Sequence, residues 1–456
     1  MISKLKQYTF DQWLRTGIYL YIFLLPWQTH WLAKSLTIEN KFWESGSIRI
    51  YATQILLWVL IVAFIADKWK FILGSLIARK LKPQSVTRHW WWVILALWIL
   101  SMMMGVYTSL DSQVSMSFWY QFLGGLGLLL LLEKVGIDRV RFAWSFVAGV
   151  ILSSIIGVYQ FFTQSSFAFK WLGLALHDPT VPGTSVVEYG IYRWLRAYGS
   201  FNHPNILGGF IVVALFLSLW LWVSAKDKKN DLLALGSLIV LLVGLFFTFS
   251  RQAWLVFAVG LIIISLVVFL KKVWRENYGW IFGKAWILIV VIAVGLSLTY
   301  WPLVRTRSVA TERLEIQSIQ QREQGYKDSW NLIKQHPLNG TGLGTYSLNL
   351  ANDMKKNNQR VLWVPEPVHN VYLLSIAEVG ASTAILYCLV ILQTAVVVWQ
   401  RYKLQKDLWS VTLGILFLVI LAIGVFDHYT WSIYPGIMLW WVIIALVYSN
   451  SVDAES

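Results

Sequence analysis

The sequence predicts an all-α integral membrane protein, on the basis of its composition, its apolar runs and the distribution of its charges. Hydrophobic residues make up 57% of the 456 residues and charged residues 13%, whereas a soluble domain has about 25% charged residues. The apolar residues come in runs of about 20, which is the length that crosses a hydrocarbon core of about 30 Å. A soluble globular enzyme and a disordered chain are therefore excluded, and the single cysteine, Cys388, excludes an internal disulfide.

The apolar runs predict about twelve transmembrane helices in one polytopic domain over residues 1–456. The first run is the weakest, because Pro26, Gln28 and His30 interrupt it, and it lacks the small-residue cleavage site of a signal peptide. We therefore expect a retained helix there. Trp90-Trp91-Trp92 and Trp440-Trp441 are expected in aromatic belts at the two membrane interfaces. The predicted spans are residues 16–34, 50–67, 90–108, 116–133, 142–163, 205–224, 232–249, 253–270, 282–303, 370–398, 409–426 and 431–449.

Lys and Arg alternate between successive connections and so predict the orientation. The connections 109–115 and 427–430 contain no Lys or Arg, and 250–252 contains only Arg251. Because basic loops stay on the cytoplasmic side, both termini are expected in the cytoplasm. Much of the net charge of +15 is then a topology signal, and no nucleic-acid partner is expected. The basic connections are residues 68–89, 134–141, 226–229, 271–284 and 401–406.

Two long segments, residues 164–204 and about 304–369, fall outside the membrane on the outer side in this topology. The larger one contains an expected amphipathic helix that ends at His336-Pro337 and is followed by a glycine-rich turn over residues 339–344. Such a helix would lie along the membrane surface or cover the bundle. The apolar positions that predict it are Ile319, Tyr326, Trp330 and Ile333.

Three polar stretches, residues 196–205, 250–252 and 369–370, each precede or begin a span that runs inward from the predicted outer face. A helix N-terminus offers unpaired N–H groups and about half a positive charge, so it attracts anions. With Arg196 and Arg251 beside these helix starts, the sequence predicts a cationic pocket at the outer headgroup level. A lipid-linked phosphate or diphosphate fits such a pocket, because arginine donates two hydrogen bonds at once.

Each of these residues also has a simpler interpretation. Arg251 could anchor the chain to lipid headgroups, and either Arg196 or Arg193 could be a solvated loop charge. His369 could cap its helix without any chemistry. Glu378 is an intramembrane carboxylate, which is costly and therefore a functional candidate, either as a partner of a cation or in a polar cavity.

Several sequence patterns of other functional classes are missing. There is no Asp-x-Asp pair, no His, Cys and Asp cluster with metal-ligand spacing, and no phosphate-binding loop of the Walker type. The predicted span interiors hold almost no ionisable groups apart from Glu378, whereas an ion-coupled transporter would have a chain of them. His203 and His336 are more simply structural. We therefore expect neither a metal nor another cofactor.

Four groups of residues, in this order along the chain, resemble the O-antigen ligase/O-antigen polymerase superfamily of bacterial membrane glycosyltransferases. The resemblance runs from about residue 190 to 380, and the earlier spans match that family only in hydropathy. The span count and the long external segment before the last three helices agree with it. The matching segments are Arg196-Ala-Tyr-Gly-Ser-Phe-Asn-His-Pro-Asn-Ile-Leu-Gly208, Thr248-Phe-Ser-Arg-Gln-Ala-Trp254, Arg322 followed by Trp330 and His336-Pro-Leu-Asn-Gly-Thr-Gly-Leu-Gly344, and His369-Asn-Val-Tyr-Leu with Ala377-Glu-Val-Gly380.

The resemblance implies transfer of a glycan from an undecaprenyl-diphosphate carrier to an acceptor on the outer face of the bacterial plasma (inner) membrane. It implies that Arg196 and Arg251 hold the diphosphate without a metal and that His369 is the base. The resemblance also implies that Arg322 binds the diphosphate, although the residues around Arg322 match the family more loosely. A single displacement at the anomeric carbon predicts inversion, and no paired carboxylates suggest a covalent intermediate. We add Asn205, Asn370 and Glu378 as supporting members of the site.

The expected partners are the carrier-linked glycan, a glycan or lipid acceptor, and membrane lipids. In ligases of the family the acceptor is a sugar of the lipid A core, and in polymerases it is another repeat unit, so both activities stay open. A non-catalytic transporter is the alternative from another class, and it should tolerate loss of His369. A structural scaffold should tolerate neutral residues at positions 196 and 251.

Overall fold

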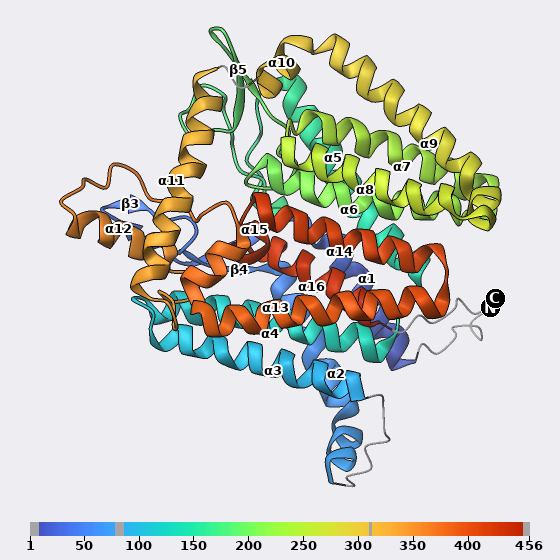
Figure 1. Cartoon of the computed structure of the whole chain (residues 1–456), viewed down its shortest axis with the longest axis horizontal. Coiled ribbons are helices and arrows are strands. Elements are labelled where there is room, and N and C mark those ends of the chain that lie inside the picture. The colour runs from blue at the N-terminus through green and yellow to red at the C-terminus, as the bar shows by residue number, and fades with distance from the viewer. Residues whose placement is uncertain (1–8, 78–85, 310–311, 450–456) are drawn as a thin grey trace.

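The structure is a computed structural model that describes residues 9–77, 86–309 and 312–449. It consists mainly of long helices and also contains three two-stranded antiparallel sheets (Figure 1). Arg79, Lys80 and Lys82 of the predicted basic connection lie outside the described residues. The helices are α1 (Phe10–Leu24), α2 (Ala52–Ile77), α3 (Val86–Tyr107), α4 (Ser112–Val135), α5 (Arg139–Thr163), α6 (Pro204–Val223), α7 (Lys228–Phe247), α8 (Arg251–Leu270), α9 (Lys272–Thr299), α10 (Trp301–Val309), α11 (Arg313–Gln335), α12 (Tyr346–Lys356), α13 (Val371–Gln405), α14 (Leu408–Phe426), α15 (Tyr429–Ser432) and α16 (Tyr434–Tyr448).

Among the described residues, nine helices are long and apolar enough to cross a membrane, namely α3 to α9, α13 and α14. The predicted class of all-α integral membrane protein is therefore confirmed. Each of the twelve predicted spans overlaps a helix, but α1 and α16 have only 15 residues each. The count of twelve membrane crossings thus stays a prediction.

The first predicted span, residues 16–34, is wrong in its boundaries. Helix α1 begins earlier, because the Thr9 side chain accepts from the Gln12 N–H and the Gln12 side chain accepts from the Thr9 N–H. It ends at Leu24, just before Pro26, whose ring cannot continue a helix. The chain then forms β1 (His30–Lys34), which pairs antiparallel with β4 (Ile48–Tyr51). Within this hairpin lies a second pair, β2 (Thr37–Ile38) and β3 (Lys41–Phe42).

Helix α6 lies at the centre of the bundle and is almost wholly enclosed, since 94% of its apolar window is buried. It packs against α5, α7, α8 and α14. Close packing depends on its small residues: a Cβ on Gly209 would lie 1.8 Å from the Tyr429 hydroxyl. The enclosed position of α6 makes its first turn a rigid platform for the residues that precede it.

The expected aromatic belts are wrong for Trp440 and Trp441, which are 3% and 0% exposed. They pack in a buried aromatic cluster around Trp98, which stacks on Tyr387 with ring centroids 5.2 Å apart. Helix α4 accommodates this cluster through Gly125, where a Cβ would lie 2.0 Å from the Trp441 ring. These large rings fill the core between helices rather than the membrane interface.

In Figure 1, α11, α12 and β3 lie on the left, and α10 and β5 lie at the top. The hairpin of β5 (Val186–Tyr189) and β6 (Tyr192–Leu195) belongs to the predicted segment 164–204, which also contains the short 3-10 helix Lys170–Leu172. The predicted amphipathic helix is confirmed as α11. Its buried side includes Ser329, Leu332 and Ile333, whereas Ile319, Tyr326 and Trp330 are exposed, so only one of the four apolar positions packs against the protein.

The glycine-rich turn after α11 is confirmed and packs onto α13. Gly340, Gly342 and Gly344 have φ values of +68°, +104° and +74°, which other residues rarely adopt. The Gly342 N–H donates to the Glu378 backbone carbonyl at 2.8 Å. Gly380 breaks α13 with a φ of +72°, so that the turn can approach the helix backbone.

Candidate active site

Arg196 follows β6 and lies buried beside the start of α6, with 5% of its surface exposed. Its Nε donates to the Thr248 carbonyl at 2.7 Å, and its Nη2 donates to Asn205 Oδ1 at 2.8 Å. Burial, and then the nearby Arg307 guanidinium group, lowers the pKa of Arg196 to about 9. That value is still above neutrality, so Arg196 is a buried cation at pH 7, held in place by neutral partners.

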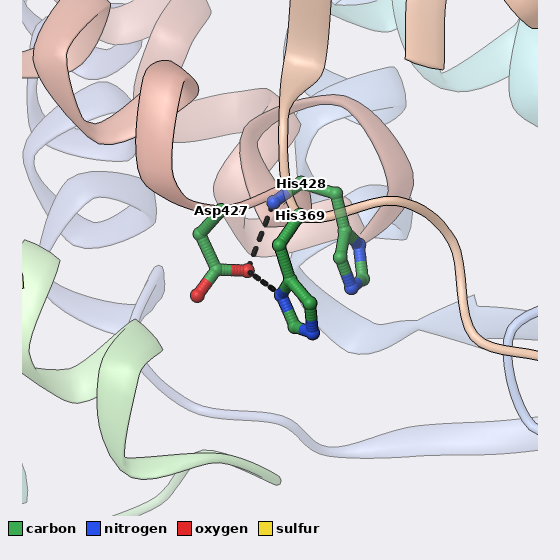
Figure 2. Close-up of side chains that lie close together, drawn as sticks. All are labelled: His369, Asp427 and His428. Carbon is green, nitrogen blue, oxygen red and sulfur yellow. Dashed lines mark hydrogen bonds and ion pairs between the residues drawn. The ribbon is translucent and has the colours of Figure 1, made fainter. Parts of the chain in front are cut away.

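Asp427, at the end of α14, connects Asn205 to the start of α13. Its Oδ2 accepts from Asn205 Nδ2 at 3.0 Å and from Gln252 Nε2 at 3.1 Å. Its Oδ1 accepts from the His428 N–H at 2.8 Å and from His369 Nδ1 at 3.4 Å (Figure 2). One carboxylate, 4% exposed, therefore ties together the starts of α6, α8 and α13.

The charges of this group can be assigned from its contacts. Burial raises the pKa of Asp427, but hydrogen bonding to His369 and the positive charge of that ring lower it well below its usual value. Burial lowers the pKa of His369, but Asp427 and Glu366 raise it more strongly, to about 9. Near neutral pH the pair is therefore a carboxylate and an imidazolium. Nε2 of His369 lies 3.7 Å from Glu366, a largely exposed residue.

The two neighbouring histidines stay neutral. His203 is the N-cap of α6, and its Nδ1 accepts from the Asn205 N–H at 3.1 Å. Burial and the Arg196 charge lower the pKa of His203 to about 3, which keeps that nitrogen free to accept. Burial and the His369 charge lower the pKa of His428 to about 4, and its Nδ1 is hydrogen-bonded to Ser432 Oγ at 2.6 Å.

Arg251 and Arg322 lie next to this network rather than within its chain of hydrogen bonds. Arg251 begins α8, and its Nη2 lies 3.1 Å from the Glu315 carboxylate. Arg322, on α11, is partly exposed, and its guanidinium group has no hydrogen-bond partner among the described residues. Its positive charge is close enough to lower the pKa of His369.

The remaining predicted residues, Asn370 and Glu378, hold local structure. Asn370, not His369, caps α13, because its Oδ1 accepts from the Leu373 N–H at 2.9 Å. Glu378 is 2% exposed and accepts from the Trp431 indole N–H at 2.9 Å. Glu378 makes no direct hydrogen bond to Arg196, Asn205 or His369 among the described residues, and it supports the glycine-rich turn instead.

A comparison with known protein families gives an independent assignment. Residues 236–388, about a third of the chain, match the family model described as O-antigen ligase. This match supports membership of the O-antigen ligase/polymerase superfamily. No curated protein sequence matches it closely enough to serve as a relative. The match and the apolar helices together support a multi-pass bacterial membrane protein of a glycosyltransferase-like family.

The family match covers part of the candidate site. Arg251, Arg322 and His369 fall inside the matched residues, whereas Arg196 and Asp427 lie outside them. Sequence reasoning missed Asp427, although it considered the connection 427–430 for its lack of Lys and Arg. The signal was available, because Asp427-His428 is a polar pair between two spans on the predicted side of His369.

The fold brings together three possible metal ligands, although the sequence has no cluster with metal-ligand spacing. His369, Asp427 and His428 place one ligand atom each within 4.8 Å of one another, although 58 residues separate the two ends of the Asp427–His369 contact. The Asp427 carboxylate already accepts four hydrogen bonds, which is about its full capacity. The three residues therefore fit a hydrogen-bonding centre better than a metal site, and metal independence stays a prediction.

Proposed function

We propose that this chain is a metal-independent glycosyltransferase of the O-antigen ligase type. It moves a glycan from an undecaprenyl-diphosphate carrier to a sugar or lipid acceptor at the outer face of the plasma membrane. The observation that carries the proposal is the hydrogen-bonded path from Arg196 through Asn205 and Asp427 to His369. It joins a buried cation to a proton acceptor, and displacement of a diphosphate by a hydroxyl group needs both.

The leaving diphosphate needs fixed donors, and Arg196 supplies them. A guanidinium group has five N–H bonds. Two of those on Arg196 are used by the Thr248 carbonyl and by Asn205, so three remain for phosphate oxygens. Arg251 adds a second cation whose side chain is 35% exposed and thus accessible to a ligand. Such preorganised donors stabilise the charge that develops on the leaving group.

The acceptor oxygen attacks the anomeric carbon, and the bond from that carbon to the diphosphate oxygen breaks, with its electron pair leaving on the diphosphate. The hydroxyl proton passes to Nε2 of His369. Asp427 accepts the hydrogen bond from Nδ1 and so fixes the ring and stabilises the imidazolium that forms. One displacement inverts the anomeric carbon. Because the pKa of His369 is about 9, the ring must first lose a proton, so the rate should rise with pH until Arg196, whose pKa is also about 9, loses its charge.

We place this site on the outer side of the membrane, with both termini in the cytoplasm. The alternation of Lys and Arg between connections supports that orientation. Arg251 contacts the Arg307 carbonyl on α10 and the Glu315 carboxylate on α11, so the site lies beside these two helices. The segments 164–204 and 304–369 would then face the acceptor, and the polyprenyl chain would stay among the membrane lipids.

The test is a transfer assay with purified full-length protein, an undecaprenyl-diphosphate oligosaccharide and two acceptors, a lipid-linked core glycan and a second repeat unit. The first acceptor indicates a ligase and the second a polymerase, with the same donor chemistry. We expect His369→Ala to abolish transfer and His336→Ala, an exposed histidine of the same segment, to retain it. Transfer that survives His369→Ala excludes His369 as the base, and absence of transfer by the unaltered protein favours a transporter. Transfer that stops with EDTA contradicts the metal-independent mechanism.

A further inference from the structure

Arg251 and Arg307 share one carboxylate, that of Glu315. Glu315 Oε2 lies 3.1 Å from Arg251 Nη2, and its Oε1 pairs with Arg307 Nη1. The Glu315 side chain is only 3% exposed and that of Arg307 10%. A single carboxylate that bridges two guanidinium groups has the shape and charge with which a phosphate group would bind them.

The turn between α7 and α8 organises these cations. The Thr248 carbonyl accepts from Arg196, and the next carbonyl, that of Phe249, accepts from Arg307 Nε at 3.1 Å. Phe249 has a φ of +46°, an unusual value for a residue with a side chain. Arg251 follows and donates to the Arg307 carbonyl at 3.3 Å. Three arginines therefore surround one turn.

The charges around this turn do not balance. Three guanidinium groups, those of Arg196, Arg251 and Arg307, face one paired carboxylate, that of Glu315. Burial lowers the pKa of Arg307, and Glu315 offsets only part of that effect. Buried cations in excess are costly, so a site of this kind gains free energy when it binds an anion.

We propose that Arg251 and Arg307 form an anion subsite for a phosphate group of the lipid diphosphate, and that Glu315 occupies this subsite until the donor displaces it. The inference rests on the proposed function and adds Arg307 to its binding residues. It also links donor binding to α11, because Glu315 and Arg322 lie seven residues apart and so on the same face of that helix. Displacement of Glu315 would act on the helix that carries Arg322.

The experiment measures binding of inorganic pyrophosphate to the full-length protein in lipid nanodiscs. Glu315→Gln removes the competing charge, so we expect pyrophosphate to bind on the order of ten-fold more tightly. The double variant Glu315→Gln with Arg307→Gln should lose that gain. Glu312→Gln is the matched control, because Glu312 is the N-cap residue of the same helix and makes no side-chain capping bond, and we expect unchanged binding.

Equal or weaker binding by Glu315→Gln would overturn the inference, because Glu315 would then only position the arginines. If that variant does not fold, Glu315→Asp decides in the same way, since its shorter side chain cannot bridge both cations and should also tighten binding. A transfer assay separates the two proposals. If the variants bind pyrophosphate as expected but the protein transfers no glycan, the proposed function is wrong and the subsite stands. If the protein transfers glycan but Glu315→Gln does not bind pyrophosphate more tightly, only the subsite is wrong.

Discussion

Replacing Asp427 by Asn tests the pairing of Asp427 with His369 while preserving the shape of the side chain. The parent carboxylate accepts from His369 Nδ1 at 3.4 Å and contributes to raising the pKa of that ring from its ordinary 6.5 to about 9. In Asp427→Asn the negative charge is gone, while burial still disfavours the protonated ring. We therefore expect the pKa of His369 to fall to about 6.5 or below.

The expected magnitude follows from the fraction of neutral imidazole. With a pKa of about 9, about 1% of the His369 rings are neutral at pH 7, whereas a pKa of 6.5 leaves about three quarters neutral. At high pH, where the ring is neutral in both proteins, the variant should transfer glycan roughly a hundred-fold more slowly, because its ring is a weaker and less well oriented base. The variant should therefore be slowest relative to the parent above pH 9 and approach it as the pH falls.

The assay is kcat/KM for glycan transfer between about pH 6 and pH 10, because this quantity reports the pKa of the free enzyme. Asp407→Asn is the control: Asp407 caps the other end of α14 and pairs with Arg139, so its pH midpoint should match that of the parent. A ratio of variant to parent rates that stays constant across this range would refute the pairing of Asp427 with His369.

Other variants test other parts of the account. Arg196→Lys should raise the donor KM by roughly ten-fold or more, because one ammonium group cannot replace a planar fork of donors, and donor titrations measure this. His203→Ala removes the cap of α6 and should lower the free energy of unfolding by about 1 kcal/mol, seen as a lower Tm; an unchanged Tm would contradict the capping role. Gly340→Ala should destabilise by roughly 1–3 kcal/mol, since its Cβ would lie 2.4 Å from the Glu378 backbone at a positive φ, whereas Gly236→Ala, in open space, should not.

Hydropathy predicted the positions of the helices because a backbone in lipid must satisfy its own hydrogen bonds. It could not predict which helices are enclosed. Helices α6 and α9 have nearly the same mean hydropathy, yet 94% of the first apolar window and 11% of the second are buried. Lipid and protein core are equally apolar, so hydropathy does not distinguish them. Nor does the sequence distinguish tryptophans at the membrane interface from buried ones, and Trp440 and Trp441 lie in the core.

The site was predictable where polar residues stand at the ends of apolar runs. Arg196, Arg251 and His369 stand out there, because they stand before or at the start of spans on the predicted outer side, where the short connections carry few basic residues. The partners that complete the site come from distant segments. The contact of Asp427 with Asn205 spans 222 residues, and that of Glu315 with Arg251 joins different helices, so no local spacing indicates either.

The most direct test of the central claim is a cryo-EM structure of the full-length protein with an uncleavable undecaprenyl-diphosphate glycan analogue. The account predicts phosphate oxygens within hydrogen-bonding distance of Arg196 and Arg251, with the anomeric carbon directed toward Nε2 of His369. A diphosphate bound at any other part of the protein, with Arg196 and His369 still in their present contacts, would contradict it.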